Sequence, residues 1–520
     1  MEEVFNNNNN NGITKTINRE VNPEIMVVDD GEVPSKSKIK SESETIIKVE
    51  ELFTPRIPRV PPFMRNHKNN KGMFDPTRVS IGPYHHGKED LQLVENIKPR
   101  VATLFLQDSN TNMDEVYSMI LEKVVDDARS YYVKRSIDEY NREQFAKMML
   151  LDGCFILAII EDFLYAISQK SKYDDVRNHL GIFLWFSTMH DIFYLVENQL
   201  PFQVLELLMS LKFKKDEGME SINKVLNFLI SMDSRHLQNK VKVNVNETDR
   251  ESFHLLQLLR TNYLNLNKSL HVLESQMGKE KDKFQCKQRL KDYIRYLFCF
   301  LKKVKFQCMR LKILRFVKKH KYSEPRYNLM EYAHSFHSVT ELKTKGIYFT
   351  PNSSLSLEAI EFKSRCFYGR LELHPFMVNP RTKVFYSNML VYEMVSSTRY
   401  GDSVISSYLD FMKSLINSQD DVKELRSKHI LFSNLGSDQE VANVFKEITT
   451  VGSRNEIYGD VMQGIQDHYN STAKTWMAEF INKYFSGPWT AIAFVAATCL
   501  FVLAFLQTYY TISPPHSSHK

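Results

Sequence analysis

The sequence predicts a mainly α-helical protein with a helical-bundle body, a small antiparallel β element and one transmembrane helix at the C-terminus. Three observations lead to this fold class. Long apolar stretches of helical length fill residues 143–165 and 191–208, and short runs rich in β-forming residues are confined to residues 346–376. Residues 489–510 carry no charged side chain over a length that suits a bilayer.

The composition indicates a folded, reduced protein. Hydrophobic residues make up 43% of the 520 residues, which is ordinary for a protein with a real core. The six cysteines are scattered and form no CxxC pair, so we expect neither a disulfide framework nor a zinc site, and no cofactor. They are Cys154, Cys286, Cys299, Cys308, Cys366 and Cys499.

The composition also changes along the chain. Residues 1–52 include the asparagine run Asn6–Asn11 and lack apolar periodicity, so we expect them to be disordered. The remaining parts, in order, are one folded domain over 53–485 (helical over 53–330, mixed over 331–485), the transmembrane helix over 489–510 and a short tail over 511–520.

In the helical part, the segment Glu143–Tyr165 is apolar nearly all round. Its acids Asp152, Glu161 and Asp162 interrupt it too closely for a membrane span, so it predicts a buried core helix. A further helix is expected to begin at Asp191, and Pro201 should kink or break it.

In the mixed part, three short runs predict strands. They are GIYFT (Gly346–Thr350), LEAIEF (Leu357–Phe362) and CFYGRLELHPF (Cys366–Phe376). We expect them to form a small antiparallel sheet or hairpin against the bundle. Helices should resume near Tyr386 and continue to the C-terminal segment.

The C-terminal segment Trp489–Tyr510 predicts a membrane anchor. Its 22 residues would span roughly 33 Å as a helix, against about 30 Å of hydrocarbon. Trp489 lies at one end, and Tyr509 and Tyr510 lie at the other, as interfacial aromatics do. Membrane lipid is therefore the predicted partner of residues 489–510.

The N-terminus, MEEVFNNNNNNG, is acidic and polar without an apolar stretch, so no signal peptide is expected. A chain of this kind would insert after synthesis, which predicts a single-pass membrane protein with its body in the cytosol. Lys474 and Lys483 before the span, against Lys520 after it, favour the same topology. Nothing in the sequence distinguishes the plasma membrane from an endomembrane.

Several motifs together resemble one known family. They are RIPRVPPFMR (56–65), VSIGPYHHG (79–87), LVENIKPR (93–100), FAKMMLLDGCFIL (145–157), DIFYLVENQLPFQVLELL (191–208), SVTELKTKGIYF (338–349), GRLELHPFMVNPRTKVFYSNMLVYE (369–393), SYLDFMKSLINSQDDVKELRSKHILFSNLGSDQEVANVF (407–445) and GPWTAIAFVAATCLFVLAFLQTYYTI (487–512). In this order they resemble the plant "domain of unknown function 247" family. The resemblance implies a mainly helical domain that ends in a membrane helix, and it supplies no catalytic residues. An association of some grass members with pollen–stigma recognition suggests an interaction role.

Five polar residues in apolar surroundings are the candidates for a functional cleft. His85 and His86 follow a Gly-Pro turn and could bind a metal or exchange protons. A metal site needs three or four ligands, and no second cluster has ligand spacing, so hydrogen bonds to the body are the alternative. The acids Asp152, Asp191 and Glu197 could form catalytic pairs with raised pKa values.

The same acids also have structural interpretations. Asp191 is placed to cap a helix N-terminus. The motif Glu197-Asn198-Gln199 precedes Pro201 and could bond the backbone groups that the proline leaves free. No GxSxG, Walker A or GxGxxG motif is present, and Cys154 lies in an apolar helix where packing is favoured over reactivity.

One segment makes the chain basic. Residues 281–321 contain 15 Lys or Arg and two acids, whereas the rest of the chain has 53 basic and 60 acidic residues. Apolar residues recur there at helical spacing, so the segment predicts a basic amphipathic helix that binds anionic lipid or an acidic protein. A solvated helix face is the alternative, and no nucleic acid is expected. The predicted contact residues are Lys302, Lys303, Lys305 and Arg310.

These observations predict a membrane-anchored interaction or recognition module without catalysis, with an unidentified protein partner. One alternative is a membrane-bound enzyme of unrecognised class that uses the acids and histidines above. The other is a sensor of anionic lipid surfaces that works through the basic helix. A cleft that holds His85 within reach of Asp152, Asp191 or Glu197 would favour the enzyme, and saturated, closed contacts would favour the interaction module.

Overall fold

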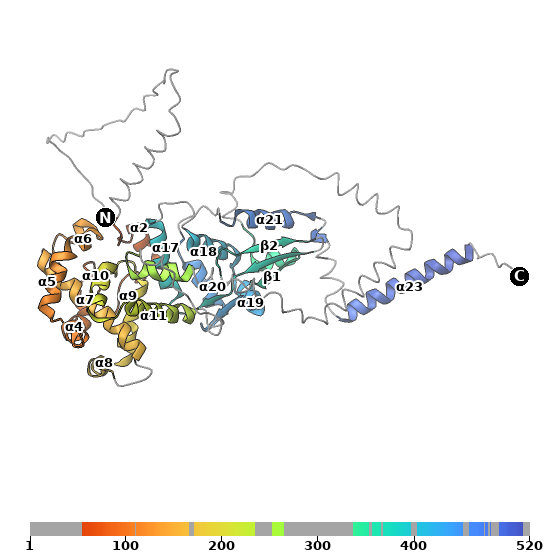
Figure 1. The fold of residues 1–520 in the computed structure, drawn as a ribbon. Helices are drawn as coiled ribbons and strands as arrows, with labels where there is room; N and C mark the ends of the chain where they lie inside the picture. The colour runs from red at the N-terminus through yellow and green to blue at the C-terminus, as the bar shows by residue number, and fades with distance from the viewer. Residues whose placement is uncertain are drawn as a thin grey trace, which may run out of the picture. The chain divides into compact units, whose positions relative to one another are not determined.

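The structure is a computed structural model of the chain (Figure 1). It describes residues 55–109, 111–165, 171–233, 252–264, 336–352, 356–365, 368–396, 403–450, 457–472, 474–476, 479 and 488–512. Contacts divide the chain into two compact units, Met1–Thr54 and Pro55–Lys520. All described residues belong to the second unit. The predictions for residues 1–52, for the basic segment 281–321 and for the tail from 513 onward lie outside them.

The helical half is built around one long helix, α7 (Arg142–Tyr165). Helices α4, α5, α10 and α11 all pack against it. The helices of this half are α2 (Pro62–Arg65), α3 (Gln92–Glu95), α4 (Lys98–Leu106), α5 (Met113–Lys123), α6 (Val125–Ser130), α8 (Asp174–Leu180), α9 (Ile182–Tyr194), α10 (Phe202–Lys212) and α11 (Glu217–Asp233), with short 3₁₀ turns at Lys68–Asn70, Glu89–Leu91 and Lys134–Ser136 and a further helix over 255–264. This arrangement confirms the predicted buried core helix.

Helix α7 is buried on nearly every side because apolar residues occupy all faces of its centre. Gly153 lets α10 approach closely, since a Cβ built there would lie 2.5 Å from Leu208 Cδ1. The close approach explains why this glycine stands inside a helix that otherwise favours larger residues.

The predicted helix that begins at Asp191 is corrected by the structure. Helix α9 starts nine residues earlier, at Ile182, directly after Gly181, whose φ of 87° ends α8. The chain leaves the helix at Leu195, and Pro201 then stands at the N-cap of α10. The expected break at Pro201 is therefore confirmed, but Asp191 lies in the last turn of α9 and caps no N-terminus.

The β structure consists of two small sheets. The first has the strand order β1-β3-β2, from β1 (Ile347–Pro351), β2 (Glu361–Ser364) and β3 (Gly369–Leu373). The β1–β3 pair is parallel and the β2–β3 pair is antiparallel. The second sheet pairs β4 (Phe376–Val378) with β5 (Leu431–Ser433) in parallel.

The predicted antiparallel hairpin is confirmed for β2 and β3, whereas the sheet as a whole is mixed because β1 pairs with β3 in parallel. Strand β3 lies between β1 and β2 in the sheet, and it runs parallel to β1. The third predicted run, Cys366–Phe376, divides into β3 and β4, which belong to different sheets. Strand β5 interrupts the helices that were expected to be continuous after Tyr386.

The remaining helices belong to the second half. They are α16 (Val339–Thr344), α17 (Thr382–Ser396), α18 (Val404–Leu415), α19 (Gln419–Ser427), α20 (Asp438–Glu447), α21 (Gly459–Tyr469) and α23 (Pro488–Ile512). Helix α17 joins the two halves. Its buried Asn388 accepts a hydrogen bond from Val196 N at 2.9 Å and donates to Met73 O at 2.8 Å.

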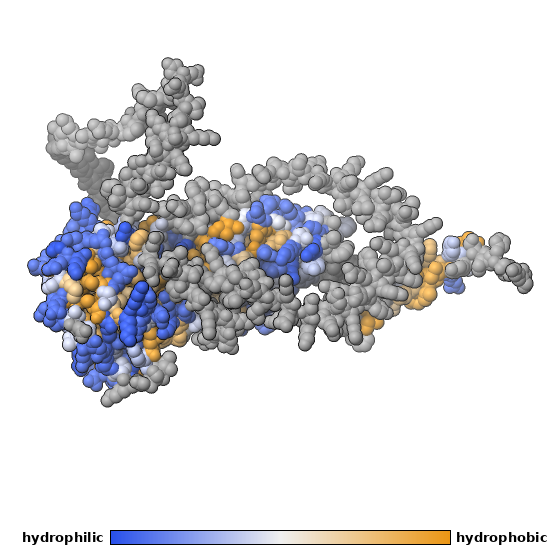
Figure 2. Space-filling view, viewed as in Figure 1, coloured by the Kyte–Doolittle hydropathy of each residue, from blue (hydrophilic) through white to orange (hydrophobic). Residues whose placement is uncertain are grey.

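The C-terminal helix α23 forms where the sequence predicts a helix, and hydrophobic residues gather along it in Figure 2. In the described part of the chain, no helix combines the length and hydropathy that a bilayer crossing requires. This finding overturns the predicted transmembrane helix at 489–510, and with it the membrane-anchored fold class and the single-pass localisation.

Candidate functional site

The segment between α9 and α10 carries three consecutive buried polar residues, Glu197, Asn198 and Gln199. Since α9 ends at Tyr194 and α10 begins at Phe202, their backbone is not helical and their side chains turn inward. Buried polar groups are stable only when they are hydrogen-bonded. All three side chains make hydrogen bonds inside the protein.

Gln199 closes the end of α9. Its Nε2 donates hydrogen bonds to Ile192 O at 2.8 Å and to Leu195 O at 2.9 Å, two carbonyls that lack helical partners. Its Oε1 accepts a hydrogen bond from Leu256 N at 2.9 Å. For Gln199 this confirms the predicted bonding of backbone groups next to the proline.

Asn198 and Glu197 bind a distant part of the chain, residues 57–82, which we call the strap. Asn198 Oδ1 accepts from Ile81 N at 2.8 Å, and its Nδ2 donates to Val79 O at 3.1 Å. Glu197 Oε1 accepts from Val60 N at 2.7 Å. These bonds connect residues more than a hundred positions apart in the sequence.

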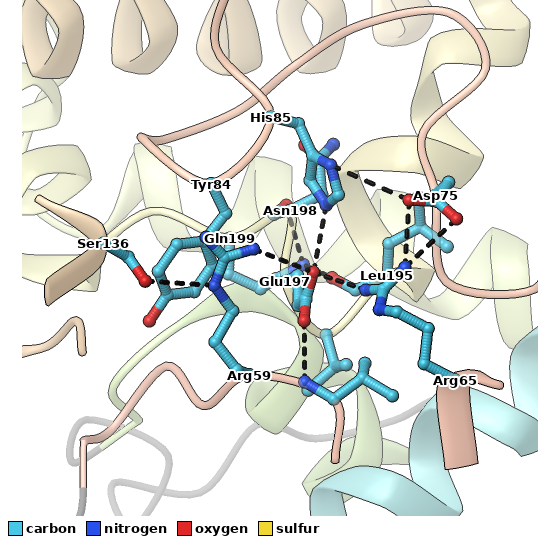
Figure 3. Close-up of polar contacts among 12 residues, drawn as sticks. Arg59, Arg65, Asp75, Tyr84, His85, Ser136, Leu195, Glu197, Asn198 and Gln199 are labelled. Atoms are coloured by element: carbon cyan, nitrogen blue, oxygen red, sulfur yellow. Dashed lines mark hydrogen bonds and ion pairs between the residues drawn. The ribbon is translucent and has the colours of Figure 1, made fainter. Parts of the chain in front are cut away.

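Glu197 is also the centre of a charged group. Its Oε2 accepts a hydrogen bond from Arg65 Nη2 at 2.6 Å, and Arg59 Nη1 lies 3.5 Å away. Figure 3 shows His85 and Arg65 directed toward this carboxylate. Burial alone would raise the pKa of Glu197, but His85, Arg65 and the Val60 N–H lower it to about 2. The side chain is therefore ionised at neutral pH.

Asp191 also binds the strap. Its Oδ2 accepts hydrogen bonds from three successive backbone N–H groups, those of Thr77 at 2.9 Å, Arg78 at 2.6 Å and Val79 at 3.1 Å. Burial raises the pKa of Asp191, and these three bonds oppose the shift. The carboxylate replaces the hydrogen bonds that this part of the strap would otherwise make in a sheet or a helix.

Asp152 binds the far end of the strap. Its Oδ2 accepts from Gly82 N at 2.7 Å, and its Oδ1 accepts from the buried ammonium of Lys98 at 2.5 Å. Gly82 has a φ of 70°, and a Cβ there would lie 2.9 Å from Gln199 O, so this position requires glycine. Burial raises the pKa of Asp152, while the Lys98 charge opposes the shift.

Lys98 is fully buried, and each of its three N–H donors has an acceptor. The acceptors are Ser80 O at 2.7 Å, Glu95 Oε2 at 2.7 Å and Asp152 Oδ1 at 2.5 Å. The sequence analysis missed this residue. A lysine between Ile97 and Pro99, where a helix begins, carries no pattern that distinguishes it from a solvated one.

The two histidines point to different acids. His85 is 2% exposed, and its Nε2 lies 3.3 Å from Glu197 Oε2, although neither ring nitrogen has hydrogen-bond geometry toward any of the described residues. Burial lowers the pKa of His85. His86 Nδ1 lies 3.3 Å from Glu95 Oε1, and this contact raises the pKa of His86. The pair therefore shares no ligand position.

Three of the five candidates thus have one role in common. Asp152, Asp191 and Glu197 all accept backbone hydrogen bonds from the strap, and Asn198 joins them. We call these four residues the clasp. His85 is within reach of Glu197, as the enzyme interpretation requires, but it is buried and the carboxylate is already engaged. Among the described residues, no group of three His, Cys, Asp or Glu is arranged to hold a metal ion.

Comparison with known proteins identifies similar chains from plants. Residues 57–503 match a family model described as "Plant protein of unknown function", domain of unknown function 247. The Arabidopsis thaliana UPF0481 protein At3g47200 is 24% identical over 458 residues, which cover 84% of this chain and 83% of that protein. The putative UPF0481 protein At3g02645 from the same plant is 21% identical over 486 residues, which cover 84% of this chain and 86% of that protein. No solved structure matches.

Proposed function

Because the chain belongs to the plant family of unknown function called domain of unknown function 247, we propose from its structure that it acts by binding another protein and that its clasp is structural. The observation that carries the proposal is the saturation of the buried acids. The carboxylate oxygens of Glu197, Asp191 and Asp152 already accept hydrogen bonds from backbone N–H groups, and those of Glu197 and Asp152 also contact cations. A general base needs a free acceptor within reach of a substrate proton.

An exposed aromatic group offers a surface for such binding. Phe183 is 91% exposed at the start of α9, next to the half-exposed Ile182. One turn further along the same face lies Phe186, whose ring is 5.9 Å from Phe163, and Phe163 is 4.7 Å from the exposed Phe228. We call these five residues the aromatic ridge. Exposed contiguous apolar groups of this kind are typical of protein interfaces, where aromatic side chains contribute most of the affinity.

The test is site-specific crosslinking. A photoreactive amino acid replaces Phe183, and a matched control places it at Glu122, an exposed position on α5. In extracts of plant tissue, we expect adducts with a defined protein at position 183 only, and their loss when Phe228→Ser is added. Equal adducts at both positions, or none at position 183, would contradict a binding role for the ridge.

The basic segment 281–321 was predicted to bind anionic lipid or an acidic protein. The segment lies outside the described residues, so this stays a prediction. The same crosslinking experiment with the photoreactive amino acid at Lys302 or Arg310 tests it.

A further inference from the structure

A second group of polar residues lies where the first sheet meets α21. Ser364 ends strand β2, His468 lies in the last turn of α21, and Lys474 follows that helix. Ser364 Oγ is 2.8 Å from His468 Nδ1 and 2.7 Å from Lys474 Nζ. His468 and Lys474 are 104 and 110 positions from the serine, so no local sequence motif indicates the group.

The strand register explains the meeting. In the antiparallel pair, Ser364 lies opposite Gly369 and Phe362 lies opposite Leu371, so Ser364 and Phe362 share one face of the sheet. Helix α21 packs against β2, and the Phe362 ring is 5.8 Å from that of His468. The serine is exposed at the end of the strand, whereas the histidine beneath it is 1% exposed.

Lys474 donates one of these hydrogen bonds, because an ammonium can only donate. Either Ser364 or His468 can be the donor of the other, since their roles depend on which ring nitrogen carries the proton. Burial, together with the charge of Lys474, lowers the pKa of His468 to about 4. The ring is therefore neutral near pH 7, and the tautomer protonated at Nε2 has its Nδ1 electron pair free to accept the serine proton. Lys474 has no carboxylate partner in the described part of the chain.

We propose that Ser364 is a nucleophilic serine that accepts acyl groups from activated esters, with His468 Nδ1 as the proton acceptor and Lys474 as the cation that stabilises the oxygen. In the acylation step, Oγ attacks the ester carbonyl carbon and its proton moves to Nδ1. A new Oγ–C bond forms, the bond to the alcohol oxygen breaks, and the alcohol leaves with the proton. In the second step, water attacks the acyl carbon and its proton moves to Nδ1. The Oγ–C bond then breaks, the carboxylic acid leaves, and the proton returns from Nδ1 to Ser364 Oγ. Serine nucleophiles are activated by a base that accepts the hydroxyl proton and by a positive charge that stabilises the negative charge developing on oxygen.

This site is separate from the clasp and goes beyond the proposed binding function. The two share no residue, so loss of one activity need not affect the other. The saturated carboxylates that argue against catalysis at Glu197 have no counterpart at Ser364, where the nucleophile is open to solvent.

The test uses the full chain and a fluorophosphonate probe, which transfers its phosphoryl group to activated serines with loss of fluoride. We expect labelling of the wild type, mapped to Ser364 by peptide mass spectrometry, and a matching burst of alcohol from p-nitrophenyl acetate. Ser364→Ala should abolish both. The control Ser427→Ala removes an exposed hydroxyl that bonds only a backbone carbonyl, and should change neither.

Two further variants test the mechanism. Lys474→Met and His468→Gln should each slow labelling by about a hundredfold. Because Lys474 is only partly buried, its replacement should leave the melting temperature unchanged. The Lys474 variant therefore tests the mechanism even if the variant of the buried His468 is unstable. Labelling of the wild type no faster than Ser364→Ala, labelling at another residue, or full labelling of the Lys474→Met protein would overturn the proposal.

Discussion

At the residue scale, buried ionisable side chains in this protein are held by contacts that decide their charge. Glu197 remains a carboxylate because Arg65 and a backbone N–H contact it, whereas His254, buried against Tyr392, has its pKa lowered to about 3 by burial. Arg260 and the first N–H groups of α18 donate hydrogen bonds to the carboxylate of Glu393. Replacing one such side chain lowers the free energy of unfolding, because its charged or hydrogen-bonding partner is then buried without a contact that satisfies it.

A first prediction concerns Glu197→Gln. The amide keeps the size of the side chain but removes the charge that faces Arg65, and it turns an N–H₂ group toward a cation. Because Arg65 is partly exposed, we expect a loss of about 2 kcal/mol in the free energy of unfolding, measured by urea denaturation. The control Glu122→Gln, on the exposed face of α5, should change it by less than about 0.5 kcal/mol. Equal effects of the two variants would show that the Glu197 contacts add no stability.

A second prediction concerns pH. In the unfolded state a histidine has a pKa near 6.5, whereas in the folded state burial lowers the pKa of His254 to about 3 and that of His190 to about 4. Stability should therefore be full above pH 6.5 and fall as the pH decreases toward 4. Each such histidine contributes up to about 1.4 kcal/mol per pH unit. Thermal melts between pH 7 and pH 5 measure the slope, and His254→Gln should make it shallower. A melting temperature that is constant over this range would contradict the assigned neutral state.

The sequence identified the acids of the clasp as unusual but not their partners. Asp152, Asp191 and Glu197 stand out because each interrupts an apolar stretch of sequence. Their partners are backbone N–H groups of the strap, which carry no side-chain signal, and Lys98, which reads like any surface lysine. Asp191 was misassigned as an N-cap because the apolar residues before it also form helix, so the helix starts at Ile182.

At the element scale, the long helices were predictable and the strand pairing was not. Helix α7 follows from a continuous apolar stretch, and its predicted start differs from the observed one by a single residue. Strand order depends on contacts between distant residues, so the parallel β1–β3 pair could not be read from local patterns. Strand β5 has three residues and pairs with a strand more than fifty positions earlier, which leaves almost no local signal.

A third prediction tests how α4 is joined to α7. Lys98→Met leaves Asp152 and Glu95 without their shared cation, so we expect a loss of about 3 to 5 kcal/mol in the free energy of unfolding. Replacing Asp152 with Asn in addition should recover part of the loss, because the buried negative charge is then gone. A double-mutant cycle in urea measures this coupling. Additive effects of the two changes would show that the pair does not link these helices.

At the scale of the whole molecule, the strap makes the folded unit depend on its first residues. Besides the clasp, Asn388 of α17 binds the carbonyl of Met73, and Ile57, Val60 and Met64 are buried in the core. Helical segments from both halves therefore hold one stretch of chain that has little regular structure. The family resemblance predicts one folded domain. It does not predict that so many side chains bind the N-terminal motifs of that domain.

A fourth prediction compares two truncations. A chain that begins at Pro55 lacks only the separate unit Met1–Thr54 and should keep its melting temperature. A chain that begins at His67 also loses three buried apolar side chains, each worth about 1.5 to 3 kcal/mol, and the contacts of Val60 and Arg65 with Glu197. We expect it to melt at a clearly lower temperature in calorimetry. Equal melting of the two truncated chains would mean that the first part of the strap is not bound.

The central claim is that the buried acids hold the strap rather than perform catalysis, and amide hydrogen exchange tests it most directly. The amides of Val60, Thr77, Arg78, Val79, Ile81 and Gly82 donate to clasp side chains and lie outside regular helices and strands. We expect these amides to exchange as slowly as the amides of α7, because exchange would require the strap to detach. Exchange at the rate of an open loop would mean that the carboxylates are free, and would contradict the structural role assigned to them.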